Sequence, residues 1–217
     1  MGNNTTEIVF ILDKSGSMAG FEDDTVGGFN ATIESHKKEE GEAFVSTFLF
    51  SNSAELIHDR VNIRDVMPMS REDFRVGGCT ALLDTIGEAI DHVERIHKYV
   101  RAEDVPAHTV FVINTDGYEN ASSRYSDERI KTMIKGKKEW GWEFIFLSAD
   151  LDAVNMANRM GIDSDRIRVF KKDSAGVFAS HRAMANAICC MRRGDDLSKA
   201  DWGEGLDGMT DRKGAKK

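Results

Sequence analysis

Three uninterrupted apolar runs limit the folds that this chain can adopt. They lie at Ile8–Leu12, Val110–Ile113 and Phe144–Leu147. Continuous apolar runs, rather than alternating apolar and polar residues, are typical of parallel strands covered on both faces. Each run is far shorter than the roughly 20 apolar residues that cross a bilayer as a helix. The runs therefore predict the central strands of a parallel sheet.

Further strands are predicted at Ala43–Phe50, Ala54–Val61 and Arg166–Phe170, the second of them antiparallel at an edge of the sheet. Helical stripes of apolar residues lie between the strands, near 26–33, 82–100, 130–134, 154–160 and 177–191. Alternating strands and helices predict a doubly wound, Rossmann-like α/β fold, with a mostly parallel sheet and helices on both faces. We expect one domain over residues 5–193. The polar segment 194–217 is expected to be a flexible or loosely docked tail.

Composition excludes several classes of partner. The formal net charge of -8 argues against general binding to nucleic acid or to an anionic membrane surface. The first residues have neither the positive region nor the apolar region of a signal peptide. The three cysteines, Cys79, Cys189 and Cys190, form no C-x-x-C pair and no even disulfide framework. We therefore expect a cytoplasmic protein, whose oligomeric state the sequence leaves open.

A cluster of oxygen-bearing side chains follows the first apolar run. Asp13, Ser15 and Ser17 alternate in the stretch DKSGS, directly after Leu12. Carboxylate and hydroxyl oxygens are hard ligands that suit Mg²⁺, Ca²⁺ or Mn²⁺ rather than zinc. Asp and Ser are also ordinary turn residues, because their side chains bind nearby backbone groups. The motif alone therefore leaves both a metal site and a simple turn open.

Two further stretches favour the metal site. Thr80 follows two glycines and precedes the clearest predicted helix, and Asp116 directly follows the strand Val110–Ile113 and its two polar residues. In an open sheet of this type, ligands bind outside the carboxyl ends of the strands. Asp13, Thr80 and Asp116 would share that edge of the sheet if the first and fourth strands are neighbours.

The order and spacing of these motifs resemble the von Willebrand factor type A domain with its metal-ion-dependent adhesion site, of the type found inside bacterial cells. That family's signature is D-x-S-x-S, a distant Thr, and a distant Asp after a central strand. The matching residues here are Asp13, Ser15, Ser17, Thr80 and Asp116. None of them departs from the pattern, and the resemblance covers about residues 5–190.

The resemblance implies the sheet order 3-2-1-4-5-6 with the third strand antiparallel. It also implies a divalent ion, normally Mg²⁺ with Mn²⁺ or Ca²⁺ as alternatives. Ser15, Ser17 and Thr80 would bind it directly, and Asp13 and Asp116 largely through water. Such an ion keeps an exchangeable position, which a Glu or Asp of a partner protein fills in this family. The resemblance thus implies a protein-binding module and not an enzyme.

The loops around the expected ion contain candidate contacts with a partner: Phe21, Tyr118, Arg124 and Tyr125. These side chains are equally compatible with ordinary loop positions.

Motifs for catalysis are missing from the sequence. It contains no Walker loop, no G-x-S-x-G and no G-x-G-x-x-G after the first strand. An ion with an open position can still activate water, so a metal-dependent phosphohydrolase is the alternative function. A third interpretation makes the chain an accessory subunit of a larger intracellular complex.

Overall fold

The computed structural model describes residues 4–206. Its strands are β1 (Thr6–Asp13), β2 (Ala43–Phe50), β3 (Ala54–Asn62), β4 (His108–Thr115), β5 (Trp142–Ser148) and β6 (Ile167–Val169). Its α-helices are α1 (Glu22–His36), α2 (Leu82–Tyr99), α3 (Asp127–Lys138), α4 (Leu151–Arg159) and α5 (Ser174–Arg193). Strands and helices alternate along most of the chain, as their apolar patterns predict.

The strands form one sheet in the order β3-β2-β1-β4-β5-β6. Every pairing is parallel except that of β2 with β3, which is antiparallel at the edge. The predicted fold class and sheet order are therefore confirmed. β1 lies in the centre and pairs in register with β2 and β4, so that Leu12 is opposite Leu49 and Asn114. This register brings the carboxyl ends of β1 and β4 to the same edge of the sheet.

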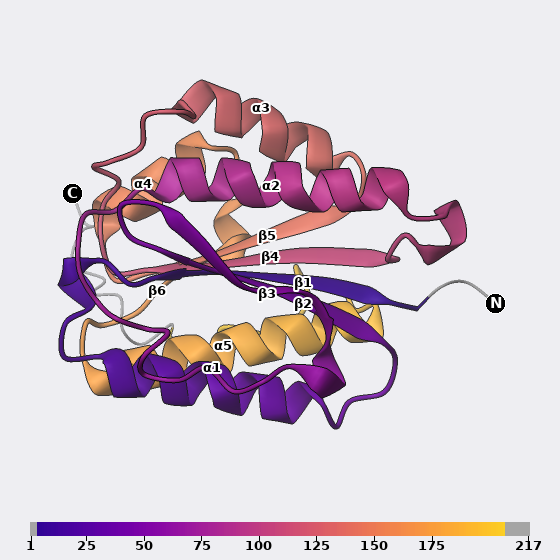
Figure 1. Ribbon diagram of the computed structural model, residues 1–217, viewed down its shortest axis with the longest axis horizontal. Coiled ribbons are helices and arrows are strands. Elements are labelled where there is room, and N and C mark those ends of the chain that lie inside the picture. The colour runs from indigo at the N-terminus through magenta and orange to yellow at the C-terminus, as the bar shows by residue number, and fades with distance from the viewer. Residues whose placement is uncertain (1–3, 207–217) are drawn as a thin grey trace, which may run out of the picture.

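Helices cover both faces of the sheet, with α1 and α5 on one side and α2, α3 and α4 on the other (Figure 1). Alternate residues of β1 explain the two layers. Ile8, Phe10 and Leu12 pack in the cluster with α1 and α5, whereas Val9 and Ile11 pack in the cluster with α2. All five side chains are at most 1% exposed. The continuous apolar run thus serves two cores at once.

The segment after α5 differs from the flexible or loosely docked tail that we expected, as far as Leu206. Leu197, Trp202 and Leu206 are all buried in the same cluster as α1 and α5. The guanidinium of Arg168 lies 4.3 Å above the ring centroid of Trp202. Three apolar side chains in a polar segment are therefore enough to hold it against the domain. The rest of the predicted tail, 207–217, lies outside the described residues.

None of the helices in residues 4–206 combines the length and the apolar character that crossing a bilayer requires.

The contact between α1 and α5 buries a histidine. His181 of α5 is 3% exposed, and neither of its ring nitrogens has a hydrogen-bond partner among residues 4–206. Gly28 of α1 makes room for it, since a Cβ at that glycine would lie 2.4 Å from the imidazole ring. Burial disfavours the charged ring and lowers the pKa of His181 to about 4.

This burial predicts a pH-dependent stability. The folded-state pKa of His181 lies below its ordinary value of 6.5, so the unfolded chain binds the proton more tightly. The stability associated with neutral His181 is complete above pH 6.5 and is lost as the pH falls toward 4. Between pH 7 and pH 5.5, the unfolding free energy of the H181N variant should fall by about 1 kcal/mol less than that of the wild type. Urea denaturation at the two pH values measures this difference. Equal losses in both proteins would mean that folding does not lower the pKa of His181.

Candidate metal centre

Asp13 lies at the carboxyl end of β1, where its side chain is almost completely buried. Its Oδ1 accepts a hydrogen bond of 2.7 Å from the backbone N–H of Ser15, and its Oδ2 accepts one of 2.5 Å from the Thr115 hydroxyl. Burial raises the pKa of the Asp13 carboxyl, while the hydrogen bonds from Ser15 and Thr115 oppose that rise. The charge of Asp116 raises the pKa further. A cation at this position would favour the ionised form.

The two predicted serines connect Asp13 to the end of β4. The hydroxyl oxygens of Ser15 and Ser17 lie 2.9 Å apart, and the Ser17 hydroxyl donates a hydrogen bond of 2.5 Å to Oδ1 of Asp116. Ser15 is 1% exposed, whereas Ser17 is open to solvent. The hydroxyl row therefore runs from the interior of the protein to its surface.

Backbone contacts between loops bring Thr80 to the same place. The N–H of Gly16 donates to the carbonyl of Gly78 at 3.0 Å, and the N–H of Gly77 donates to the carbonyl of Lys14 at 2.9 Å. Gly78 has φ +81°, a conformation that favours glycine. These bonds join the loop after β1 to the loop before α2. Thr80 lies in the second of these loops, directly before the buried Ala81.

Gly117 gives the clearest measure of how closely the site residues approach one another. A Cβ placed on this glycine would lie 3.2 Å from the Ser17 hydroxyl oxygen, 3.4 Å from that of Thr80 and 3.9 Å from Oδ2 of Asp13. Three oxygens from two separate segments, the end of β1 with its following loop and the loop before α2, thus surround one point beside Asp116. The structure brings together all the residues that we predicted as metal ligands.

The residues fit a hard divalent ion. Oδ2 of Asp116 is buried and accepts no hydrogen bond of good geometry within the described residues, although the ammonium group of Lys172 lies 2.8 Å from it. No cluster of three or more His, Cys, Asp or Glu side chains in residues 4–206 is arranged to hold a metal. The candidate site instead has two carboxylates and three hydroxyl groups, which suit Mg²⁺, Mn²⁺ or Ca²⁺. Ser15, Ser17 and Thr80 would hold such an ion, with Asp13 and Asp116 supplying the negative charge around it.

Lys172 is a site residue that the sequence analysis missed. It lies between β6 and α5, and its Nζ is 2.8 Å from Oδ2 of Asp116. The Lys172 side chain is 45% exposed, whereas that of Asp116 is 2% exposed. The ammonium group therefore approaches the buried carboxylate from the solvent side. No spacing rule singles out a lysine in a loop, so only the fold could reveal this contact.

The loop 117–125 beside the site is fixed by acidic residues of α2 and of the loop itself, which the sequence analysis also missed. Asp84 accepts hydrogen bonds of 2.9–3.0 Å from the backbone N–H groups of three successive loop residues, Ser123, Arg124 and Tyr125. Glu119 accepts from the backbone N–H of Leu83 at 2.9 Å. An acidic residue in the first turn of a predicted helix is a weak signal, because such residues are common there.

Asn120 holds the same loop against Thr80. Its Oδ1 accepts a hydrogen bond of 2.8 Å from the N–H of Thr80, and its own N–H donates to the Thr80 carbonyl at 3.1 Å. The Thr80 hydroxyl is left to face the site.

The four predicted partner contacts lie in different surroundings. Tyr118, next to Gly117, is 46% exposed at the rim of the site, and Phe21 is half-buried against the core beside α1. Arg124 is exposed and forms an ion pair with Glu88.

Tyr125 is anchored to α2 instead of facing outward. Its hydroxyl donates a hydrogen bond of 2.6 Å to Asp91, and a Cβ at Gly87 would lie 2.3 Å from its ring. The guanidinium of Arg129 lies 4.4 Å above the ring centroid. Tyr125 thus holds the loop to the helix.

A methyl group at Gly117 should weaken metal binding without unfolding the protein. In the G117A variant, the new Cβ lies among the hydroxyl oxygens of Ser17 and Thr80. We expect the affinity for Mg²⁺ to fall by about tenfold or more, equivalent to roughly 1.4 kcal/mol. Isothermal titration calorimetry on metal-stripped protein measures it. G136A is the matched control, because a Cβ at Gly136 meets nothing within 4 Å. Unchanged affinity in G117A would place the ion elsewhere.

Removal of the Lys172 ammonium group should strengthen metal binding, because a divalent ion and this lysine compete for Asp116. In K172M we expect Mg²⁺ affinity to rise about two- to fivefold, the range expected from an exposed ion pair. K171M makes the same change of charge on the same loop, without the contact to Asp116, and should bind Mg²⁺ like the wild type. Calorimetry in low salt compares the three proteins. If K172M binds Mg²⁺ no more tightly than K171M, Lys172 does not compete with the ion.

None of the protein-family models matches the sequence, and neither does any curated protein. Solved structures, by contrast, match it over most of its length. A mutant of the PilB minor pilin from Streptococcus sanguinis has a TM-score of 0.60 and 14% identity, over 85% of this chain and 61% of that one. The von Willebrand factor type A protein from Catenulispora acidiphila has a TM-score of 0.56 and 13% identity, over 83% of this chain and 42% of that one.

An aerotolerance-related membrane protein from Bacteroides fragilis matches with a TM-score of 0.51 and 14% identity, over 87% of this chain and 99% of that one. The chain thus spans less than two thirds of the pilin and of the Catenulispora protein, but nearly all of the Bacteroides protein. At these identities the likeness concerns the fold alone. The chain has the fold of the von Willebrand factor type A domain.

Proposed function

We propose that the chain is a divalent-cation-dependent protein-binding module, whose ion accepts a Glu or Asp side chain of a partner protein. The ion is Mg²⁺, with Mn²⁺ or Ca²⁺ as alternatives. The observation that carries the proposal is the convergence of Asp13, Ser15, Ser17, Thr80 and Asp116 at the carboxyl edge of the sheet.

The chemistry of these ligands supports a role in adhesion. Three of the side chains are neutral hydroxyls, so they do not reduce the charge of a divalent ion. The carboxylates of Asp13 and Asp116 already accept hydrogen bonds from Thr115 and Ser17. An ion held in this way keeps net positive character and an exchangeable position, and it attracts a carboxylate from outside.

The surface around the site supports access by a protein. Ser17 is open to solvent at the outer end of the hydroxyl row, and Tyr118 is exposed beside it. Phe21 and Arg124 lie on the loops around the same edge. A partner that inserts a carboxylate would contact these side chains at the rim of its interface.

We also propose a cytoplasmic setting and a role as an accessory subunit of a larger intracellular complex. The three cysteines of the chain, Cys79, Cys189 and Cys190, form no disulfide bonds, which suits a reducing compartment.

Titration of Mg²⁺ into metal-stripped protein tests the site. The wild type should bind one ion, whereas D13A should lose binding. The S17A variant should bind Mg²⁺ about tenfold or more weakly, because it lacks one of the proposed direct ligands. Since Ser17 is exposed, the substitution should leave the rest of the surface unchanged. S164A, at an exposed serine just before β6 and therefore at the opposite edge of the sheet, is the matched control and should bind normally. Equal affinity in D13A and the wild type would contradict the site.

Affinity capture with and without a chelator tests the function. A partner should be retained in Mg²⁺ and released by EDTA, it should not bind S17A, and one of its acidic residues should be required. The proposal would be contradicted if the partner were retained equally with and without EDTA and equally by the wild type and by S17A. Hydrolysis of a generic phosphoester in Mg²⁺ or Mn²⁺, abolished in D116A, would instead favour a phosphohydrolase.

A further inference from the structure

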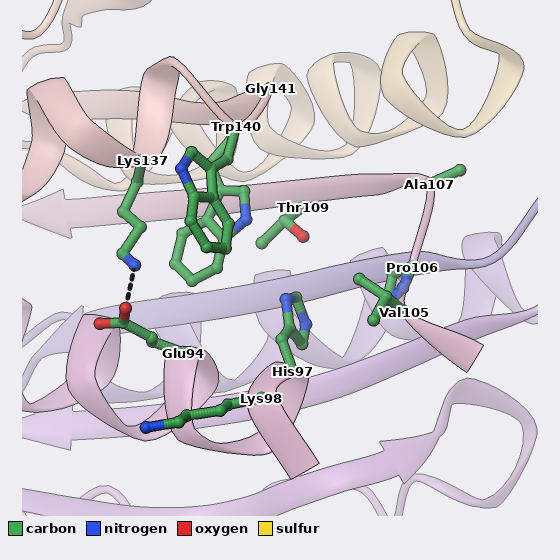
Figure 2. A pocket seen from close by; sticks show the side chains of 11 residues that line it. Glu94, His97, Lys98, Val105, Pro106, Ala107, Thr109, Lys137, Trp140 and Gly141 are labelled. Carbon is green, nitrogen blue, oxygen red and sulfur yellow. Dashed lines mark ion pairs between the residues drawn. The ribbon is translucent and has the colours of Figure 1, made fainter. Parts of the chain in front are cut away.

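A cavity of about 390 Å³ lies at the opposite edge of the sheet from the candidate metal centre. It opens where β4 and β5 begin and where α2 and α3 end (Figure 2). Thr109 of β4 and Trp142 of β5 line it from the sheet. The segment 105–107 lies along one side (Figure 2). A volume in this range is typical of sites that bind small molecules. Nothing in the proposed adhesive function uses it.

Two indole rings give the cavity flat aromatic walls. Trp140 is 72% exposed, which is unusual for so large an apolar side chain, whereas Trp142 is buried. The Nζ of Lys137 lies 4.9 Å from the ring centroid of Trp140 and 5.2 Å from that of Trp142. Figure 2 shows Lys137 beside Trp140, with its ion pair of 2.7 Å to Glu94. The exposed indole offers a face on which a second planar ring can stack.

Polar groups face the same space. The side chain of His97 is 8% exposed, and its ring packs edge-on against Trp142 at 5.4 Å between centroids. Its Nε2 is buried, lies 3.5 Å from Oε2 of Glu7, and has no hydrogen-bond partner in the described residues. Figure 2 shows the ring of His97 rising from α2 toward the hydroxyl of Thr109. Because the Nε2 of His97 is turned toward Glu7, the hydroxyl of Thr109 is the hydrogen-bonding group that this pair offers to a ligand, and His97 contributes its ring to the lining.

The charge of the lining favours an anion. Lys98 and Lys137 contribute two positive charges, and Glu94 contributes one negative charge, which Lys137 already pairs. Lys98 is exposed, and residues 4–206 provide no ion pair for it. A ligand that brings one negative charge would therefore meet an unpaired cation at the opening of the cavity.

We propose that this cavity binds a small planar aromatic anion, such as an aromatic carboxylate. Its ring stacks on Trp140, and its carboxylate lies toward the lysines, with Thr109 as a hydrogen-bonding group. This site is separate from the metal centre and does not depend on the proposed adhesive function.

Three probes test the proposed chemistry: 2-naphthoate, its neutral analogue 2-naphthamide, and the non-aromatic cyclohexanecarboxylate. The readout is the indole N–H resonances of the full chain in nitrogen–proton correlation spectra. 2-Naphthoate should shift the signals of Trp140 and Trp142 in a saturable way. It should leave Trp202 unchanged, because Trp202 is buried on the other face of the sheet. The other two probes should bind at least about threefold more weakly, since each lacks either the charge or the ring.

Variants locate the ligand. The affinity of W140A for 2-naphthoate should be about fivefold lower than that of the wild type, because stacking on the indole is lost. W140F should recover part of that affinity. K98Q should bind 2-naphthoate about two- to threefold more weakly than the wild type and should bind 2-naphthamide with unchanged affinity. Y99A removes a similarly exposed ring, 79% exposed and outside the lining, and serves as the matched control. No saturable shift up to millimolar 2-naphthoate, equal shifts of Trp202, or equal binding by W140A would overturn the proposal. Equal binding of cyclohexanecarboxylate would refute an aromatic ligand.

Discussion

The parallel pairing of β1 with β4 is the constraint on which the candidate metal centre depends. The two strands run in register from Thr6 opposite His108 to Leu12 opposite Asn114. The next residues are then Asp13 on one strand and Thr115 on the other, which join through a buried hydrogen bond of 2.5 Å. A shift of one residue would turn every side chain of β1 to the opposite face and would place its apolar residues in the wrong core. Packing of the two cores therefore also fixes the position of the metal ligands.

The same arrangement has an electrostatic cost. It brings the buried carboxylates of Asp13 and Asp116 close together, and the charge of Asp116 contributes to the raised pKa of Asp13. Hydrogen bonds from Ser15, Ser17 and Thr115 satisfy three of the carboxylate oxygens, and the fourth, Oδ2 of Asp116, is next to the ammonium of Lys172. A cation is thus the natural neighbour of this oxygen. Lys172 reaches it from the surface, so the proposed exchange of its ammonium for a divalent ion would not require the core to move.

Strong local signals predicted the strands, and the resemblance to the von Willebrand factor type A domain implied their order and the close approach of the candidate metal ligands. The continuous apolar runs identify the strands, and Asp13 and Asp116 come directly after buried strands. Lys172 gave no such signal, since its role depends on where the loop after β6 lies relative to β4. The segment 194–217 was expected to be a flexible or loosely docked tail because it is polar, yet as far as Leu206 a few buried apolar side chains, Trp202 among them, pack it against the domain. Tyr125 appeared to be a surface residue until the glycine opposite it, Gly87, showed that its ring lies against α2.

The candidate metal centre and the cavity lie at opposite ends of β4, but this strand is poorly suited to couple ligand binding at one site to ligand binding at the other. Its side chains are buried in both cores, and a packed strand of this kind has no second arrangement to adopt. Helix α2 connects the two sites more directly. Asp84 in its first turn binds the loop beside the metal centre, and His97 in its last turns lines the cavity. Energetic coupling requires an element whose equilibrium both ligands bias. Coupling through α2 would require that both ligands shift the position of this helix on the sheet.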